Sequence, residues 1–113
     1  MRDNMYCKIY LSTELVFGEL YQCICSMTLG RLESVRTIKT DWGEIDLCKN
    51  SEFSLERVKN TPEDFVFWQY YLDIEPKNGI DVSKYIEQIA KLLKNLNLNN
   101  MKVVASCDFE ENL

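Results

Sequence analysis

Hydrophobic and polar residues alternate along several short segments, which is the pattern of a β-strand with one buried face. The longest alternation runs from Phe65 to Glu75, where apolar residues at even positions fall on one face. The segments 32–40 and 44–48 flank the turn sequence Asp41-Trp42-Gly43 and therefore predict a hairpin. The predicted strands are 7–11, 32–40, 44–48, 65–75 and 102–109.

Two other segments carry apolar residues at helical spacing. The first follows the N-cap candidates Ser12 and Thr13 and ends near Thr28, and the second follows Asp81 or Ser83. A polar stretch, 50–64, contains helix breakers and predicts a loop with one helical turn near 54–59. The apolar stripes consist of Val16, Leu20, Ile24 and Met27 in the first helix, and of Ile86, Ile89, Ala90, Leu93 and Leu96 in the second.

The order of these elements is β-α-β-β-β-α-β. Because each helix has a single apolar stripe, both must cover the same face of a shared sheet. We therefore predict one α+β domain over residues 1–113. It is a two-layer sandwich with a mostly antiparallel sheet of about five strands and two helices on one face, as a variant of the ferredoxin-like arrangement.

The other face of this sheet remains open in the prediction. Open sheet faces are usually polar, yet this one carries aromatic residues among acidic ones, a composition typical of interface anchors. In an alternative reading, the loop 50–64 folds over this face and buries it. The predicted core face holds Ile9, Leu11, Ile45, Leu47, Trp68, Leu72 and Ile74. The predicted open face holds Tyr6, Tyr10, Asp46, Phe67, Tyr71 and Asp73.

Composition limits the classes of function. The chain has 18 acidic and 13 basic residues, a net charge of −5, which is the wrong sign for a nucleic-acid binder. Residues 41–76 hold nine of the acidic residues and three of the basic ones, so the excess is local. This pattern indicates either a solvated surface that aids solubility or a surface shaped for a basic protein partner.

Candidate catalytic chemistry is sparse. Histidine is absent, which removes the commonest general base and metal ligand. The five cysteines lack zinc-site or disulfide-scaffold spacing, so free thiols and no metal or other cofactor are expected. With no signal peptide or apolar membrane segment, we expect a cytoplasmic protein that binds neither a membrane nor nucleic acid directly.

Two pairs of carboxylates support an enzyme hypothesis that we consider alongside binding. Asp73/Glu75 and Asp108/Glu110 lie at the ends of strands that would be neighbours, and four oxygens there would hold Mg²⁺ or divide acid and base roles. Carboxylates at strand ends are usually only solvated, however, and no His or Gly-rich loop follows them to bind a phosphate or polarise a substrate. Trp42 in the hairpin turn is either a partner-binding anchor or a cap on one end of the core.

Three segments of the C-terminal part carry a resemblance to a known family. They are Tyr70-Tyr71-Leu72-Asp73-Ile74-Glu75-Pro76, the helix 84–93 and the stretch 103–110. These segments resemble the small acidic immunity proteins of bacterial contact-dependent inhibition and other polymorphic toxin systems. The resemblance implies a cytosolic protein without enzymatic activity that neutralises one cognate toxin domain, often a nuclease such as a tRNase.

The resemblance carries a role but no fixed site, so the predicted partner-binding residues come from the charge map. A small homodimeric regulatory or housekeeping domain, and a metal-dependent enzyme using the four carboxylates, remain as alternatives. The predicted partner-binding residues are Asp41, Trp42, Glu44, Asp46, Phe67, Tyr71, Asp73, Glu75, Asp108 and Glu110.

Overall fold

The computed structural model describes residues 5–113. Its strands are β1 (Cys7–Ser12), β2 (Arg31–Leu32), β3 (Thr37–Lys39), β4 (Gly43–Lys49), β5 (Tyr70–Pro76) and β6 (Lys102–Ser106). Its helices are α1 (Phe17–Thr28), α2 (Leu55–Asn60) and α3 (Val82–Leu98), with short 3₁₀ turns η1 (Phe65–Phe67) and η2 (Glu110–Asn112). Within this described part, no helix combines the length and the apolar character that crossing a membrane would need.

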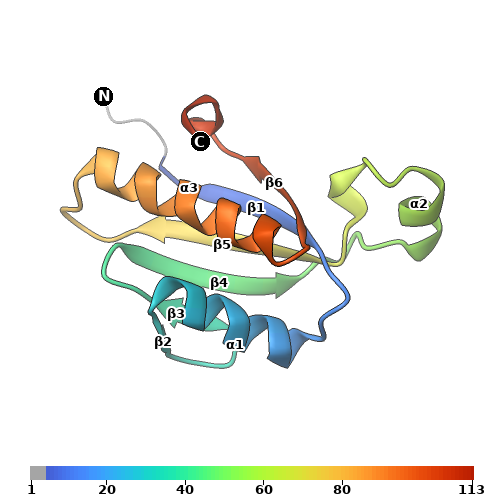
Figure 1. The fold of residues 1–113 in the computed structure, drawn as a ribbon, viewed down its shortest axis with the longest axis horizontal. Coiled ribbons are helices and arrows are strands. Elements are labelled where there is room, and N and C mark those ends of the chain that lie inside the picture. The colour runs from blue at the N-terminus through green and yellow to red at the C-terminus, as the bar shows by residue number, and fades with distance from the viewer. Residues whose placement is uncertain (1–4) are drawn as a thin grey trace.

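The six strands form one antiparallel sheet in the order β2-β3-β4-β5-β1-β6 (Figure 1). The α+β class and the antiparallel sheet are therefore confirmed, with six strands instead of about five. Helices α1 and α3 lie over the same face of the sheet (Figure 1) and bury Leu20 and Ile24 of the first predicted stripe, and Ile89 and Leu96 of the second, against it. The prediction of Val16 in the first stripe was wrong, because Val16 precedes α1 and is 63% exposed. Between them and the sheet lie Ile9, Leu11, Leu20, Ile24, Ile38, Ile45, Leu47, Leu72, Ile74, Tyr85, Ile89 and Leu96, all fully buried.

The predicted strand 32–40 is split by a tight bend. The backbone N–H of Glu33 donates to the carbonyl of Thr37 at 2.9 Å, so the chain folds back before β3 begins. The hydroxyl of Tyr21, on α1, donates to the carbonyls of Ser34 and Thr37. A helix side chain therefore supplies hydrogen bonds to backbone carbonyls of the bend.

The predicted strand 65–75 is also shorter than its alternation indicates. The side chain of Asn50 donates to the carbonyls of Val66 and Trp68 at 2.9 and 2.7 Å, and the Trp68 indole N–H donates to the carbonyl of Pro62 at 3.0 Å. These bonds tie the segment to its own loop, so the strand begins only at Tyr70. Trp68 is buried as predicted, but it lies outside the core cluster between the sheet and the helices, and the placement of Phe67 on the open strand face was wrong.

Candidate functional site

Four carboxylates lie together on the open face of the sheet, and we call them the carboxylate block: Glu44 and Asp46 on β4, Asp73 and Glu75 on β5. The strand register sets Glu44 directly opposite Glu75 and Asp46 directly opposite Asp73. Glu44, Asp73 and Glu75 are exposed, and Asp46 is half-buried. Like charges directly opposite each other destabilise a sheet, so this arrangement costs folding free energy.

Within residues 5–113, no ion pair neutralises the block. Among residues 5–113, the ion pair that forms joins Lys39 and Glu33, at 3.8 Å, and neither belongs to the block. The Thr37 hydroxyl donates to a carboxylate oxygen of Asp46 at 2.6 Å, which fixes that side chain without cancelling its charge. The block therefore presents its negative charges to solvent and to any partner.

An aromatic strip adjoins the block, and we define it as Tyr10 on β1, Tyr71 on β5 and Phe65 in η1. Tyr10 lies opposite Tyr71 in the register, with ring centroids 6.3 Å apart, and Phe65 packs on Tyr10 at 5.0 Å. The Lys8 ammonium lies 4.2 Å from the centroid of the Tyr71 ring. This cation–π contact holds Lys8 over the strip, although Asp73 is its register partner on β5.

The pKa of the Tyr71 hydroxyl is higher than that of an ordinary tyrosine. A hydrogen bond with the Cys48 thiol, burial and the nearby charge of Asp73 together raise its pKa above the ordinary value. The pKa of the Cys48 thiol is raised as well, mainly by burial. Both groups are therefore neutral near pH 7, and Tyr71 offers a phenol that is part apolar surface and part hydrogen-bonding group.

The loop between β4 and β5 covers only one end of this face. Helix α2 lies beyond the end of the sheet (Figure 1), and η1 reaches back to β1, where Phe65 meets Tyr10. Tyr71 is half-buried, whereas Asp73 remains exposed. The alternative in which residues 50–64 bury the whole face is therefore wrong, and the carboxylate block stays open.

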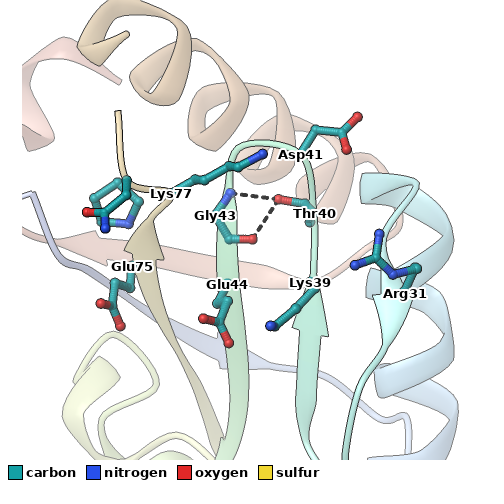
Figure 2. A pocket seen from close by; sticks show the side chains of 10 residues that line it. Arg31, Lys39, Thr40, Asp41, Gly43, Glu44, Glu75 and Lys77 are labelled. Carbon is teal, nitrogen blue, oxygen red and sulfur yellow. Dashed lines mark hydrogen bonds between the residues drawn. The ribbon is translucent and has the colours of Figure 1, made fainter. Parts of the chain in front are cut away.

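A hollow of about 390 Å³ lies at the end of the face where β3 turns into β4. Figure 2 shows Lys39, Glu44 and Glu75 in a row across three neighbouring strands, with Asp41 at the turn above them. Its rim carries charges of both signs and includes Glu44 and Glu75, so basic side chains adjoin the carboxylate block at this end. The charged lining residues are Arg31, Lys39, Asp41, Glu44, Glu75 and Lys77.

The second predicted carboxylate pair lies beyond the edge strand β6. Asp108 and Glu110 follow β6 and line a separate hollow of about 310 Å³ together with Asp73. Strand β1 lies between β5 and β6, so the expectation that the two pairs end neighbouring strands was wrong. Within residues 5–113 no group of three or more potential ligands is arranged to hold a metal ion.

Two predicted anchors lie away from the open face. Trp42 is 6% exposed and packs against Tyr85, with ring centroids 6.1 Å apart, so it caps the core instead of offering a partner-binding surface. Phe67 lies in η1, where the Arg57 guanidinium covers its ring at 4.7 Å. The sequence did not predict a role for Lys8, because its contact with the Tyr71 ring depends on the pairing of β1 with β5.

Comparison of the chain with protein-family models, with curated proteins and with solved structures found no match. The functional argument therefore rests on the geometry and charge of the open face.

Proposed function

We propose that this protein is a cytoplasmic immunity protein without catalytic activity, which binds and neutralises a cognate bacterial toxin domain. The partner surface is the open face, with the carboxylate block as its charged part and the aromatic strip as its apolar part. The toxin domain would be basic, such as a nuclease that contacts the phosphates of a tRNA.

The observation that carries this proposal is the like-charge register of the block. Two directly opposed carboxylate pairs, Glu44 with Glu75 and Asp46 with Asp73, weaken the free protein. Arg or Lys side chains of a partner would relieve that repulsion and gain charge-assisted hydrogen bonds at the same time. Binding a cation-rich surface thus turns an unfavourable arrangement into a favourable one.

The electrostatics also fit rapid inhibition. A negative face on a chain of net charge −5 attracts a positive domain over a distance of about a Debye length and raises the association rate. A nuclease needs its basic surface for phosphates, so an acidic protein on that surface competes with the substrate. The half-buried rings of Tyr10 and Tyr71 supply apolar contact area next to the charges.

Self-association through the same face is less favourable. A twofold symmetric dimer brings the same patch of each subunit together. Two carboxylate blocks would then face each other, adding repulsion between copies to the repulsion within each. This charge argument favours a basic partner over a second copy of the chain.

We also infer that β4, β5, β1 and β6, with α1 and α3, are a variant of the ferredoxin-like arrangement. The order β4-β5-β1-β6 supports this inference, because α3 connects two strands that are separated by β1. Likewise, β5 lies between β1 and β4, which are the strands before and after the segment that contains α1. Strands β2 and β3 would then be an extension at one edge.

The test begins with purification of the tagged protein from its native host and identification of the protein that remains bound. That partner is then expressed as an isolated domain. Its association rate is measured at low and physiological ionic strength with the wild type and with the variant Asp73→Lys/Glu75→Lys. Because steering depends on charge, we expect the variant to associate at least tenfold more slowly at low salt.

The control is Glu87→Lys, compared with the single variant Glu75→Lys because each reverses one charge; Glu87 is also exposed but belongs to α3, on the opposite face. We expect it to change the association rate far less than Glu75→Lys does. The toxin domain's activity should be blocked by the wild type and recover with the double variant. An acidic partner, or equal rates for the wild type and the double variant, would contradict the proposal.

A further inference from the structure

The sulfur atoms of two cysteines meet at the edge of the sheet although 100 residues separate them. The Cys7 thiol donates to the Cys107 sulfur at 3.4 Å. The pairing of β1 with β6 ends at Lys8 and Ser106, and Cys7 and Cys107 are the residues next to this last pair. Both residues are free thiols.

This position satisfies the backbone requirements of a disulfide. Directly opposed residues in an antiparallel pair have Cα atoms about 4.5 or 5.5 Å apart, and disulfides join Cα atoms about 4.4–6.8 Å apart. Cys7 lies on the same face of β1 as Ile9 and Leu11, and Cys107 continues the face of Val103 and Ala105. Both side chains therefore point to the same side, and the sulfurs need approach only by a small rotation.

The two thiols differ in access. Both residues line the 310 Å³ hollow, but Cys7 is 1% exposed whereas Cys107 is half-buried. Burial, and then the hydrogen bond with Cys107, raise the pKa of the Cys7 thiol. An external reagent therefore meets Cys107 first, and Cys7 is placed to react only with a species already attached to Cys107.

We propose that Cys7 and Cys107 are a reversible disulfide site in which Cys107 is the entry thiol, Cys7 is the resolving thiol and a low-molecular-weight disulfide is the oxidant. The Cys107 thiolate attacks the small disulfide, forms a mixed disulfide and releases one small thiolate. Cys7 then loses its proton to water, and its sulfur displaces the second small thiolate. The two protein thiols lose two electrons and two protons in total, and the small disulfide becomes two thiols.

The bond would join β1 covalently to the segment after β6, which carries Asp108 and Glu110. This site does not depend on the proposed toxin partner. The other three cysteines provide internal references: Cys23 and Cys25 lie on α1, and Cys48 lies on β4 beside Tyr71.

The test treats the reduced, full-length chain with oxidised glutathione at neutral pH, followed by acid quenching and thiol counting in denaturant. We expect the count to fall from five thiols to three, the mass to fall by two hydrogen atoms, and peptide mapping to join Cys7 with Cys107. Dithiothreitol should restore all five thiols.

The variants Cys107→Ser and Cys107→Ala should keep their remaining four thiols, whereas Cys23→Ser should fall from four to two. Two replacements at position 107 keep the test valid if one of them folds poorly. Retention of five thiols by the wild type, a glutathione adduct that persists on Cys107, or a link between any other cysteines would overturn the proposal.

Discussion

The like-charge register predicts that the protein becomes more stable when one of its exposed carboxylates is removed. Glu75 is the most suitable position, because its β4 partner is Glu44 and it forms no ion pair with any residue that the structure describes. Lys39, opposite Glu44 on β3, is paired with Glu33 instead. Replacing Glu75 by Gln should remove one repulsion, and replacing it by Lys should turn that repulsion into an attraction.

The magnitude follows from the cross-strand distance. Directly opposed residues place their Cβ atoms about 5 Å apart, and two unit charges about 6 Å apart in water interact by about 0.7 kcal/mol. Screening reduces this to about 0.3 kcal/mol at physiological salt, whereas most of it remains at about 10 mM salt. Glu75→Gln should therefore stabilise by about 0.6 kcal/mol at low salt, and Glu75→Lys by about 1 kcal/mol.

Urea unfolding at about 10 mM and about 1 M salt measures this effect, with an unchanged slope showing that only stability differs. Asp73→Asn is the informative contrast, because Asp73 lies between Asp46 on one side and Lys8 on the other. Its loss should change stability very little. A destabilised Glu75→Lys variant, or a gain in stability that is the same at both salt concentrations, would refute the electrostatic reasoning.

Three further predictions concern Trp42 in the core, Gly43 in the hairpin and the ionisable hydroxyl of Tyr71. Trp42→Ala should cost about 3–5 kcal/mol in urea unfolding, because the side chain caps the core; a loss below about 1 kcal/mol would place it at the surface. Gly43→Ala should cost about 1–3 kcal/mol by the same assay, because a Cβ there meets the backbone carbonyl of Glu75; unchanged stability would show that the strands can separate. The raised pKa of Tyr71 contributes stability that is complete below the unfolded-state pKa and is lost as pH rises through the folded-state pKa. Stability should therefore fall less steeply above pH 10 in Tyr71→Phe than in the wild type, and identical pH profiles would contradict this assignment.

Local patterns predicted much of the fold because burial acts on each residue separately. Alternation identified β1 and β4 within about one residue at each end, and the stripe after Asp81 identified α3. The side chain of Asp81 accepts from the Ser83 N–H at 3.3 Å, as its N-cap role requires. These features depend on neighbours within a few positions, which a single sequence displays.

The same patterns gave wrong or ambiguous predictions where residues outside a segment form hydrogen bonds or packing contacts with it. Phe65 to Phe67 alternate as a strand would, but Asn50 and Pro62 bind this part of the chain to the loop. Trp42 could equally be an exposed anchor or a core cap on sequence grounds. Its contact with Tyr85, from a helix about 40 residues later, decided between them.

The sequence by itself determined which residues are charged, which alternate and that acidic residues concentrate between 41 and 76. Only the tertiary structure decided that Glu44 faces Glu75, that Lys8 lies over Tyr71 and that Cys7 meets Cys107. The physical reason is that charge and hydropathy belong to single residues, whereas repulsion, cation–π attraction and thiol pairing depend on distances between strands. Those distances are set by strand order and register, which the whole core fixes together.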